Sequence, residues 1–374
     1  MDTVKLMRAL ASLCGAKVAL DEEIISLKEK IGIHDHYLFI LLDGFGNNLL
    51  EKTDSTFFKK KKAQILKSVF PSTTASALTS ITTLHYPTYH GAIGWWTYLA
   101  EFEKSSVYLP FIDRETGKKL QEFAISPEEV FYDPCFLSTL TTRVKSYLPK
   151  TYFDSPYSRY SRGNTLAEGY EKIEETFSMI EDFAFKEVGP SYQYLYFPLI
   201  DSLEHEFGTD SIQVRECVEK TLKLIEEFSK KNLGKIRFVI TADHGLIDIP
   251  EDNNFVIDDD HPLLPLLKVP PACETRVPMF FLKDQFQSEQ FANIFNEYFD
   301  EQFTLISKDE AKSRELFGSD PWHPVSEKRI GDFLALPKGP WTLQYRGKNY
   351  SPVILKAVHG AFSPEETEVP LLLI

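Results

Sequence analysis

The sequence predicts an α/β fold: a doubly wound, mostly parallel sheet with helices on both faces and an inserted cap. Three apolar runs, at residues 37–42, 193–199 and 236–241, have the length and the β-branched or aromatic content of buried strands. Segments with helical patterning alternate with these runs, which is typical of parallel strands joined by crossovers. A carboxylate follows each run within a few residues, so the pattern of a buried strand followed by an acidic residue occurs three times along the chain.

The other elements follow from the same patterns, taken in chain order. Residues 1–33 have the pattern of one or two amphipathic helices. Residues 165–188 and 211–230 each predict a further helix. Residues 277–282 predict another strand, and residues 369–374 end the chain in an apolar run.

Two regions are predicted to lie outside the central sheet. Residues from about 95 to 190 are rich in aromatic side chains and polar turns, so we expect a cap inserted over the core. A second insert is expected at about 250–345, beginning with the acidic loop at 251–261. No linker or break in composition marks an independent unit, so we expect a single domain over residues 1–374.

The charge and composition exclude several classes of protein. A formal net charge of −14 argues against binding to a nucleic-acid polymer, which needs a basic face. It is compatible with small phosphate esters, because bound metal ions supply positive charge locally. No run approaches the roughly 18 apolar residues of a membrane span. Arg8 and Lys17 interrupt any signal-peptide core, and the 4 cysteines form no C-x-x-C pair. We therefore expect a cytoplasmic protein with reduced thiols; leaderless secretion stays open.

Carboxylates and imidazoles gather at the predicted strand ends. In a doubly wound sheet the carboxyl ends of the strands converge on one edge, so residues far apart in sequence meet there. Asp201 and His205 are four residues apart and share a face on a helical turn. Carboxylate and imidazole together suit divalent zinc, and their number is enough for two ions. The candidate ligands are Asp43, Asp201, His205, Asp243, His244 and His359.

A hydroxyl-rich segment at residues 69–80 precedes a predicted helix. Pro, Ser and Thr before a helical pattern are helix-start signals, and a helix N-terminus favours an anionic group. An alkoxide nucleophile that also holds phosphate would suit this position, and paired metal ions suit displacement at phosphorus. The Gly44-x-Gly46 pair does not indicate a dinucleotide fold, because Leu49 stands at the third glycine position.

These motifs together make the chain resemble the alkaline phosphatase superfamily and, within it, the type I phosphodiesterase/nucleotide pyrophosphatase family. The resemblance covers nearly the whole chain. It rests on Leu42-Asp43-Gly44, Phe70-Pro-Ser-Thr-Thr74, Tyr86-Pro87 with His90-Gly91, Asp201-x-x-x-His205, Thr241-Ala-Asp-His-Gly245, Glu274-Thr-Arg276, Arg329-Ile-Gly-Asp332 and His359-Gly-Ala-Phe-Ser-Pro-Glu-Glu366.

The resemblance implies an alkaline phosphatase-like catalytic domain with two zinc ions, although other divalent metals stay open. It implies that Asp43, Asp243 and His244 hold one zinc, to which Thr74 also binds. It assigns the other zinc to a second set of ligands, Asp201, His205 and His359. Thr74 is the implied nucleophile, and its attack would give a phospho-threonine intermediate during hydrolysis of a small phosphodiester or nucleotide pyrophosphate.

The chain also departs from the family pattern. Nucleotide-cleaving members usually have an aromatic residue directly after the nucleophile and an asparagine three positions after it, where this chain has Ala75 and Ala77. The specificity for nucleotides is therefore open. The residues expected to contact a small phosphate-ester substrate are Phe45, Ser76, Trp95 and Trp96.

Three alternatives remain at this stage. A metal-dependent phosphomonoesterase or a phosphonate hydrolase would use the same ligands, and a catalytically inactive binding protein would keep the fold. Metal analysis separates the last, because an inactive descendant is expected to lack two stoichiometric zincs. A sulfatase is disfavoured because the chain has no Cys-x-Pro-x-Arg or Ser-x-Pro-x-Arg segment.

Overall fold

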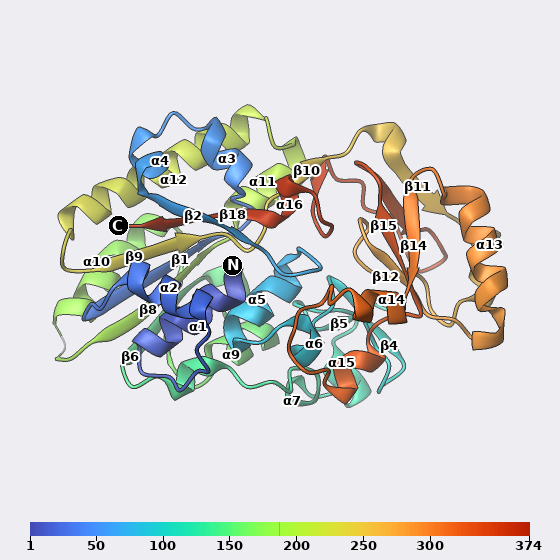
Figure 1. Ribbon diagram of the computed structural model, residues 1–374, viewed down its shortest axis with the longest axis horizontal. Helices are drawn as coiled ribbons and strands as arrows, with labels where there is room; N and C mark the ends of the chain where they lie inside the picture. Colours follow the sequence, from blue (N-terminus) through green and yellow to red (C-terminus); the bar gives the residue numbers. More distant parts are fainter. Residues whose placement is uncertain (187) are drawn as a thin grey trace.

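A computed structural model describes residues 1–186 and 188–374 and contains two large sheets side by side (Figure 1). The first is a seven-stranded sheet with the order β2-β18-β9-β1-β8-β6-β7. Its strands are β2 (Lys62–Lys67), β18 (Glu368–Leu373), β9 (Arg237–Thr241), β1 (His36–Leu42), β8 (Ser191–Phe197), β6 (Arg143–Pro149) and β7 (Leu166–Tyr170). The three strands predicted from the apolar runs, β1, β8 and β9, are adjacent in its centre.

The large sheet confirms the predicted fold class. Strands β9, β1, β8, β6 and β7 run parallel, whereas β18 runs antiparallel to both of its neighbours. Every residue of β1 after His36 is buried, which requires cover on both faces. In Figure 1, α1 (Thr3–Leu13), α2 (Glu22–Ile31) and α5 (Thr74–Thr83) lie on one face. The other face is covered by α3 (Asn47–Lys52), α4 (Thr56–Lys61), α11 (Leu199–Phe207) and α12 (Ile212–Lys231).

The helix boundaries follow ordinary capping chemistry. Asp2 and Asp21 accept hydrogen bonds from backbone N–H groups in the first turns of α1 and α2. Ser211 does the same for α12, where the predicted helix at 211–230 is confirmed. The predicted amphipathic segment at the N-terminus is thus two helices whose apolar faces pack on the large core.

The second sheet lies beside the first and consists of seven short strands in the order β14-β15-β13-β12-β3-β4-β5. All its pairings are antiparallel. Its strands are β3 (Trp96–Leu99), β4 (Lys104–Val107), β5 (Ile112–Asp113), β12 (Ala272–Cys273), β13 (Pro278–Phe280), β14 (Phe303–Ser307) and β15 (Phe333–Pro337). The helices and two-stranded pairs around it are α6 (Pro87–His90), α7 (Pro127–Val130), α13 (Ser288–Phe299), α14 (Lys308–Ser313), α15 (Pro324–Lys328), β11 (Asn254–Ile257) with β16 (Thr342–Tyr345), and β10 (Ile247–Asp248) with β17 (Ala357–Val358).

The predicted cap at 95–190 differs from what the structure contains. Only its first part, through β5, belongs to the second sheet; β6, β7 and α10 (Ile173–Phe185) extend the large one. The predicted helix at 165–188 is in fact β7 followed by α10, and residue 187 lies outside the described residues. The reason is that β7 is an edge strand with alternating exposed positions, so it lacks the continuous apolar run of a central strand. Whether both sheets fold as one domain stays a prediction.

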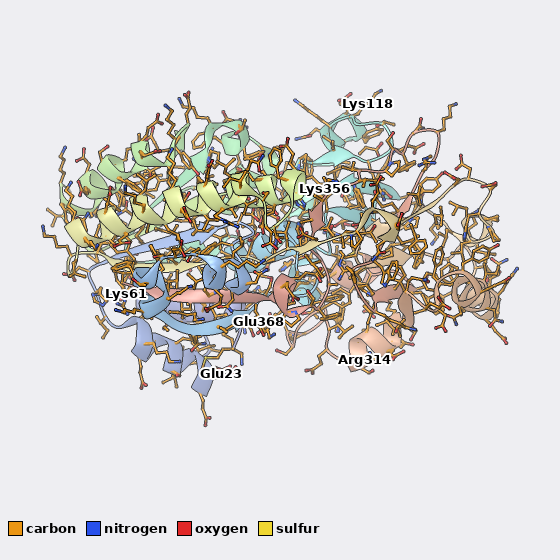
Figure 2. The ribbon with its side chains drawn as sticks, turned by 90° about the horizontal axis from the view of Figure 1, so that it is seen from above. Glu23, Lys61, Lys118, Arg314, Lys356 and Glu368 are labelled. Atoms are coloured by element: carbon orange, nitrogen blue, oxygen red, sulfur yellow. The ribbon has the colours of Figure 1, made fainter. Side chains whose placement is uncertain are left out.

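Charged side chains lie on the outer surface of the molecule. Figure 2 shows charged side chains such as Lys118 and Arg314 on the outside of the molecule, and both residues are exposed. None of the helices in the described parts of the chain has the length and apolar content needed to cross a membrane. The cytoplasmic location expected from the sequence stays a prediction.

Candidate metal centre and active site

The parallel register of three strands brings the predicted ligands together. Leu42 of β1 lies beside Phe197 of β8, and Leu41 lies beside Thr241 of β9. Asp43 and Asp243 therefore leave the sheet at the same edge, as expected for the carboxyl ends of parallel strands. Asp201 comes from the first turn of α11, and its backbone N–H donates to the Asp43 carbonyl at 3.2 Å.

Gly44 makes the close approach of α11 to β1 geometrically feasible. Its φ of 76° is in the left-handed region, and a Cβ at this position would lie 2.8 Å from both the Asp201 Cα and a Glu204 carboxylate oxygen. A side chain at residue 44 would push α11 away. The close packing of α11 against the end of β1 therefore requires glycine directly after Asp43.

Three histidines have their proton position fixed by backbone carbonyls. Nδ1 of His205 lies 2.7 Å from the Ala357 oxygen, Nδ1 of His359 lies 3.1 Å from the Ser72 oxygen, and Nδ1 of His244 lies 3.2 Å from the Gly245 oxygen. A carbonyl only accepts, so we assign the proton of each neutral ring to Nδ1. Each Nε2 then carries a lone pair.

Those lone pairs face carboxylates. Nε2 of His205 is 3.3 Å and Nε2 of His359 is 3.8 Å from Oδ1 of Asp201. Nε2 of His244 is 3.3 Å from Oδ2 of Asp243 and 3.6 Å from Oδ1 of Asp43. Two acceptors facing each other at such distances are unfavourable unless a proton or a metal cation lies between them.

Two of the carboxylates, Asp43 and Asp243, each have one oxygen with hydrogen-bond donors among the described residues and one without. Oδ1 of Asp243 accepts from the N–H groups of Gly44 and His244 at 3.2 and 2.9 Å, and Oδ2 of Asp43 accepts from the Tyr196 hydroxyl. Oδ2 of Asp243, Oδ1 of Asp43 and Oδ1 of Asp201 are buried, and no described residue donates to them. These bare oxygens are the ones that face the imidazole nitrogens, so the donor set fits divalent metal ions.

The electrostatics of the centre agree with this arrangement. Burial raises the pKa of Asp43 well above its usual value, and the charges of Asp243 and Asp201 raise it further. Burial also raises the pKa of Asp201 and Asp243, and lowers the pKa of His244 and His359. Without a cation the centre disfavours both kinds of charge, and a metal ion would remove the repulsion among its carboxylates.

The ligand atoms form two overlapping groups. In one group, Asp201, His205 and His359 each offer an atom within 4.8 Å of the others. In the second group Asp43 and His244 meet the same criterion together with Asp201. Asp243 adjoins this second group through His244. Asp201 therefore lies within reach of both groups, although the family resemblance assigns it to one.

Thr74 is the first residue of α5 and joins the second group. Its Oγ1 lies 3.0 Å from Nε2 of His244, and its side chain is 8% exposed. The preceding Thr73 is the N-cap residue of this 10-residue helix. A hydroxyl at this position lies in the positive field of the helix N-terminus and beside the metal ligands.

A cavity of about 370 Å³ opens from this centre. It begins at Asp43, Thr74 and Asp201 and runs toward α8 (Lys150–Phe153) and α9 (Pro156–Arg162). No lysine, arginine or histidine of the described chain lines it. The rest of its lining is mostly apolar, aromatic or hydroxylic: Leu78, Thr82, Trp95, Leu109, Pro110, Leu148, Thr151, Tyr152, Ser155, Tyr157, Ser158, Ser161, Tyr194, Tyr196, Pro198 and Ser202.

Comparison with known proteins identifies the family. The family profile described as type I phosphodiesterase/nucleotide pyrophosphatase matches residues 37–362. The chain belongs to this family. Its members are metal-dependent hydrolases of phosphoric esters, and the chain is an enzyme of this class. A search of curated proteins found no match.

Solved structures agree on the fold. An inactive variant of murine ectonucleotide pyrophosphatase/phosphodiesterase 5 in complex with AMP is 14% identical, with a TM-score of 0.67, and the alignment covers 90% of this chain and 87% of that one. The human protein of the same name is 17% identical with the same TM-score and coverage. Phosphonoacetate hydrolase from Sinorhizobium meliloti, in complex with phosphonoformate, is 17% identical, with a TM-score of 0.64 and coverage of 90% and 89%.

The four residues expected to contact a substrate lie in different environments in the structure. Trp95 is 37% exposed and lines the cavity together with Thr74. Phe45 is fully buried in the large core, and Ser76 is fully buried with its Oγ donating to the Ala92 carbonyl at 2.9 Å. The Arg114 guanidinium lies over the Trp96 ring, with its central carbon 3.9 Å from the ring centroid. Trp96 does not line the cavity. In this structure the side chains of Phe45 and Ser76 are both engaged in packing, and their contact with a substrate stays a prediction.

Some residues at or near the metal centre were not predicted from the sequence. Tyr194 and Tyr196 are two apart on β8 and face the cavity, a period-2 signal that the strand pattern contained. Glu204 lies between Asp201 and His205, is fully buried, and neither of its carboxylate oxygens has a donor in the described chain. Burial raises its pKa well above the usual value, with the charge of Asp201 adding to the effect, so the neutral acid is favoured.

Proposed function

We propose that this protein is a two-zinc phosphodiesterase that hydrolyses a small phosphodiester or nucleotide pyrophosphate through a phospho-threonine at Thr74. The observation that carries the proposal is the set of Nε2 lone pairs and bare carboxylate oxygens meeting beside Thr74 Oγ1. Mixed imidazole and carboxylate ligands favour zinc over the harder cations. Asp43, Asp243 and His244 would hold one ion and His205 and His359 the other, with Asp201 within reach of both.

The ions would supply positive charge that lowers the pKa of the Thr74 hydroxyl and stabilises the charge developing on the phosphate oxygens. The chain itself positions the nucleophile and the phosphate. Thr74 Oγ1, after losing its proton to water, would form a bond to phosphorus while the bond from phosphorus to the leaving oxygen breaks; that oxygen belongs to an alcohol in a diester and to a phosphate in a pyrophosphate. The N–H groups at the start of α5 would bind the phosphate oxygens, because the first N–H groups of a helix have no partner within it. Water would then cleave the phospho-threonine and restore the hydroxyl.

The cavity has room for an organic group of the ester beyond the metal centre. It runs from Thr74 to Tyr152 and Tyr157, where a group attached to the phosphate would lie. Its mostly apolar lining suits an uncharged group. A phosphonate hydrolase is the second candidate, supported by the structural likeness to phosphonoacetate hydrolase.

The test combines metal analysis with substrate comparison. Purified protein should contain two zinc ions per chain by plasma mass spectrometry and should hydrolyse bis-p-nitrophenyl phosphate faster than p-nitrophenyl phosphate or phosphonoacetate. Thr74→Ala should retain the zinc and lose the hydrolysis by about a thousandfold or more. Full activity of Thr74→Ala would refute the nucleophile, and faster release of phosphate from phosphonoacetate would favour the second candidate. A protein without stoichiometric metal and without hydrolysis of any of the three would be an inactive binding protein.

A further inference from the structure

We propose that Glu274 is a positioning residue that keeps the N-terminus of α5 free to bind phosphate oxygens. It does so by holding the hydroxyl of Thr73, the residue before the proposed nucleophile. Glu274 directly follows β12 of the second sheet, whereas Thr73 and Thr74 begin α5, a helix on a face of the large sheet. The inference rests on the proposed function, because it assigns a role in binding the phosphate of the substrate.

The backbone aims Glu274 at α5. Cys273, directly before it, has φ of 73°, a conformation that is strained for a residue with a side chain. Strand β12 reaches this position because Gly94 lies against it: a Cβ on Gly94 would be 2.8 Å from the Cys273 Cα. The Cys273 thiol donates to the Ile93 carbonyl at 3.1 Å and secures the turn. The turn therefore has a fixed direction.

The Glu274 carboxylate makes two short contacts through a single oxygen. Oε1 accepts a hydrogen bond from Thr73 Oγ1 at 2.7 Å and another from the Trp95 N–H at 2.6 Å. The residue is 8% exposed. Glu274 thus connects the start of α5 to Trp95, which lines the cavity. Hydrogen bonds to a carboxylate are stronger than hydrogen bonds between neutral groups, so this connection is firm.

These contacts change what Thr73 can do. An N-cap threonine ordinarily accepts a hydrogen bond from an N–H group in the first turn of its helix. Thr73 makes no such side-chain bond, and its hydroxyl donates to Glu274 instead. The first backbone bond within α5 runs from the Ala77 N–H to the Thr73 carbonyl at 2.9 Å. The earlier N–H groups are therefore left for an anionic ligand beside Thr74.

Loss of the carboxylate should let Thr73 cap its own helix. The hydroxyl would then compete with phosphate oxygens for the same N–H groups. Removing the hydroxyl as well should relieve the competition, so a second substitution would repair the first. A merely structural role for Glu274 predicts the opposite, because two lost packing groups would add their effects.

The experiment compares Glu274→Ala, Glu274→Gln, Thr73→Val and the Glu274→Ala/Thr73→Val double variant, all loaded with zinc. Binding of inorganic phosphate is measured by calorimetry, and kcat and KM are measured with bis-p-nitrophenyl phosphate. We expect about tenfold weaker phosphate binding and a similar fall in kcat for Glu274→Ala. The double variant should return to within about threefold of wild type. Glu274→Gln, which keeps an acceptor oxygen, should also stay within about threefold.

Three results would overturn the inference, and the first two are unchanged phosphate binding in Glu274→Ala and a double variant that binds phosphate at least as weakly as Glu274→Ala. A wild type that fails to bind phosphate would also overturn it. Equal zinc content and melting temperature across the set separate this role from damage to the metal centre or the fold. If wild type binds phosphate but hydrolyses no ester, the proposed function fails while the phosphate titrations still decide the role of Glu274.

Discussion

Replacement of Glu274 by glutamine should remove a pH-dependent loss of stability. Burial raises the pKa of this carboxyl from 4.5 to about 7, even though the hydrogen bonds from Thr73 and Trp95 oppose the shift. Glutamine has nearly the same shape and keeps an acceptor for both donors, but it does not titrate. The comparison of wild type with Glu274→Gln therefore isolates the ionisation.

The sign follows from where the proton is bound. Between the unfolded pKa of 4.5 and the folded value of about 7, folded Glu274 keeps a proton that the unfolded chain has lost. The stabilisation is therefore fully present below pH 4.5 and is lost as the pH rises through 7. A raised pKa of this size corresponds to about 3 kcal/mol, at roughly 1.4 kcal/mol per pKa unit. The free energy of unfolding of wild type, relative to Glu274→Gln, should fall by about 3 kcal/mol between pH 4.5 and pH 8.

Urea unfolding of both proteins in the presence of a chelator, followed by fluorescence across this pH range, measures the difference. The chelator is needed because a zinc ion near Glu274 would lower the pKa of its carboxyl group and reduce the change in stability with pH. The carboxylates of the metal centre titrate in both proteins, so their contribution cancels in the comparison. A difference that does not vary with pH would refute the reasoning, because Glu274 would then have the same pKa in both states.

Three further predictions concern the centre and its cavity. Tyr196→Phe removes the donor to Oδ2 of Asp43 and should weaken zinc binding tenfold to a hundredfold, measured by competition with a fluorescent chelator; unchanged affinity would mean that Tyr196 does not orient the ligand. Asp201→Asn should lose more zinc than His205→Ala by plasma mass spectrometry, because Asp201 lies within reach of both ligand groups; equal losses would assign it to one. Tyr152→Ala should raise KM for bis-p-nitrophenyl phosphate several-fold at unchanged zinc content, because Tyr152 lines the cavity. The control is Phe286→Ala, at a residue that is 99% exposed, and this variant should leave KM unchanged.

The strands that carry the candidate ligands were predictable for a local reason. Strands β1, β8 and β9 lie in the centre of a sheet, are buried on both faces, and so appear in the sequence as apolar runs. Polar residues directly after such a run leave the sheet at its carboxyl edge, which brings Asp43 near Asp243. The helical spacing of Asp201 and His205 was also local information.

Edge strands and packing partners were not predictable in this way. Strands β6 and β7 have half-exposed, irregular patterns. Their place in the sheet depends on the pairing of β6 with β8 and of the edge strand β7 with β6. Phe45 follows Asp43 and Gly44 and looked available for a substrate, yet its side chain is buried in the large core. Exposure of a loop residue depends on what packs over it, which neighbouring residues in the sequence do not reveal.

The sequence by itself determined the sheet centre, the residue types at its carboxyl edge and the family. The tertiary structure decided which atoms face one another: the Nδ1 bonds that turn three Nε2 lone pairs toward carboxylates, and the reach of Asp201 to both ligand groups. It also decided that Glu274, 200 residues beyond Thr74, touches the residue beside it. Local patterns follow from burial along one strand or helix, whereas these contacts follow from how two sheets pack, and packing is a property of the whole chain.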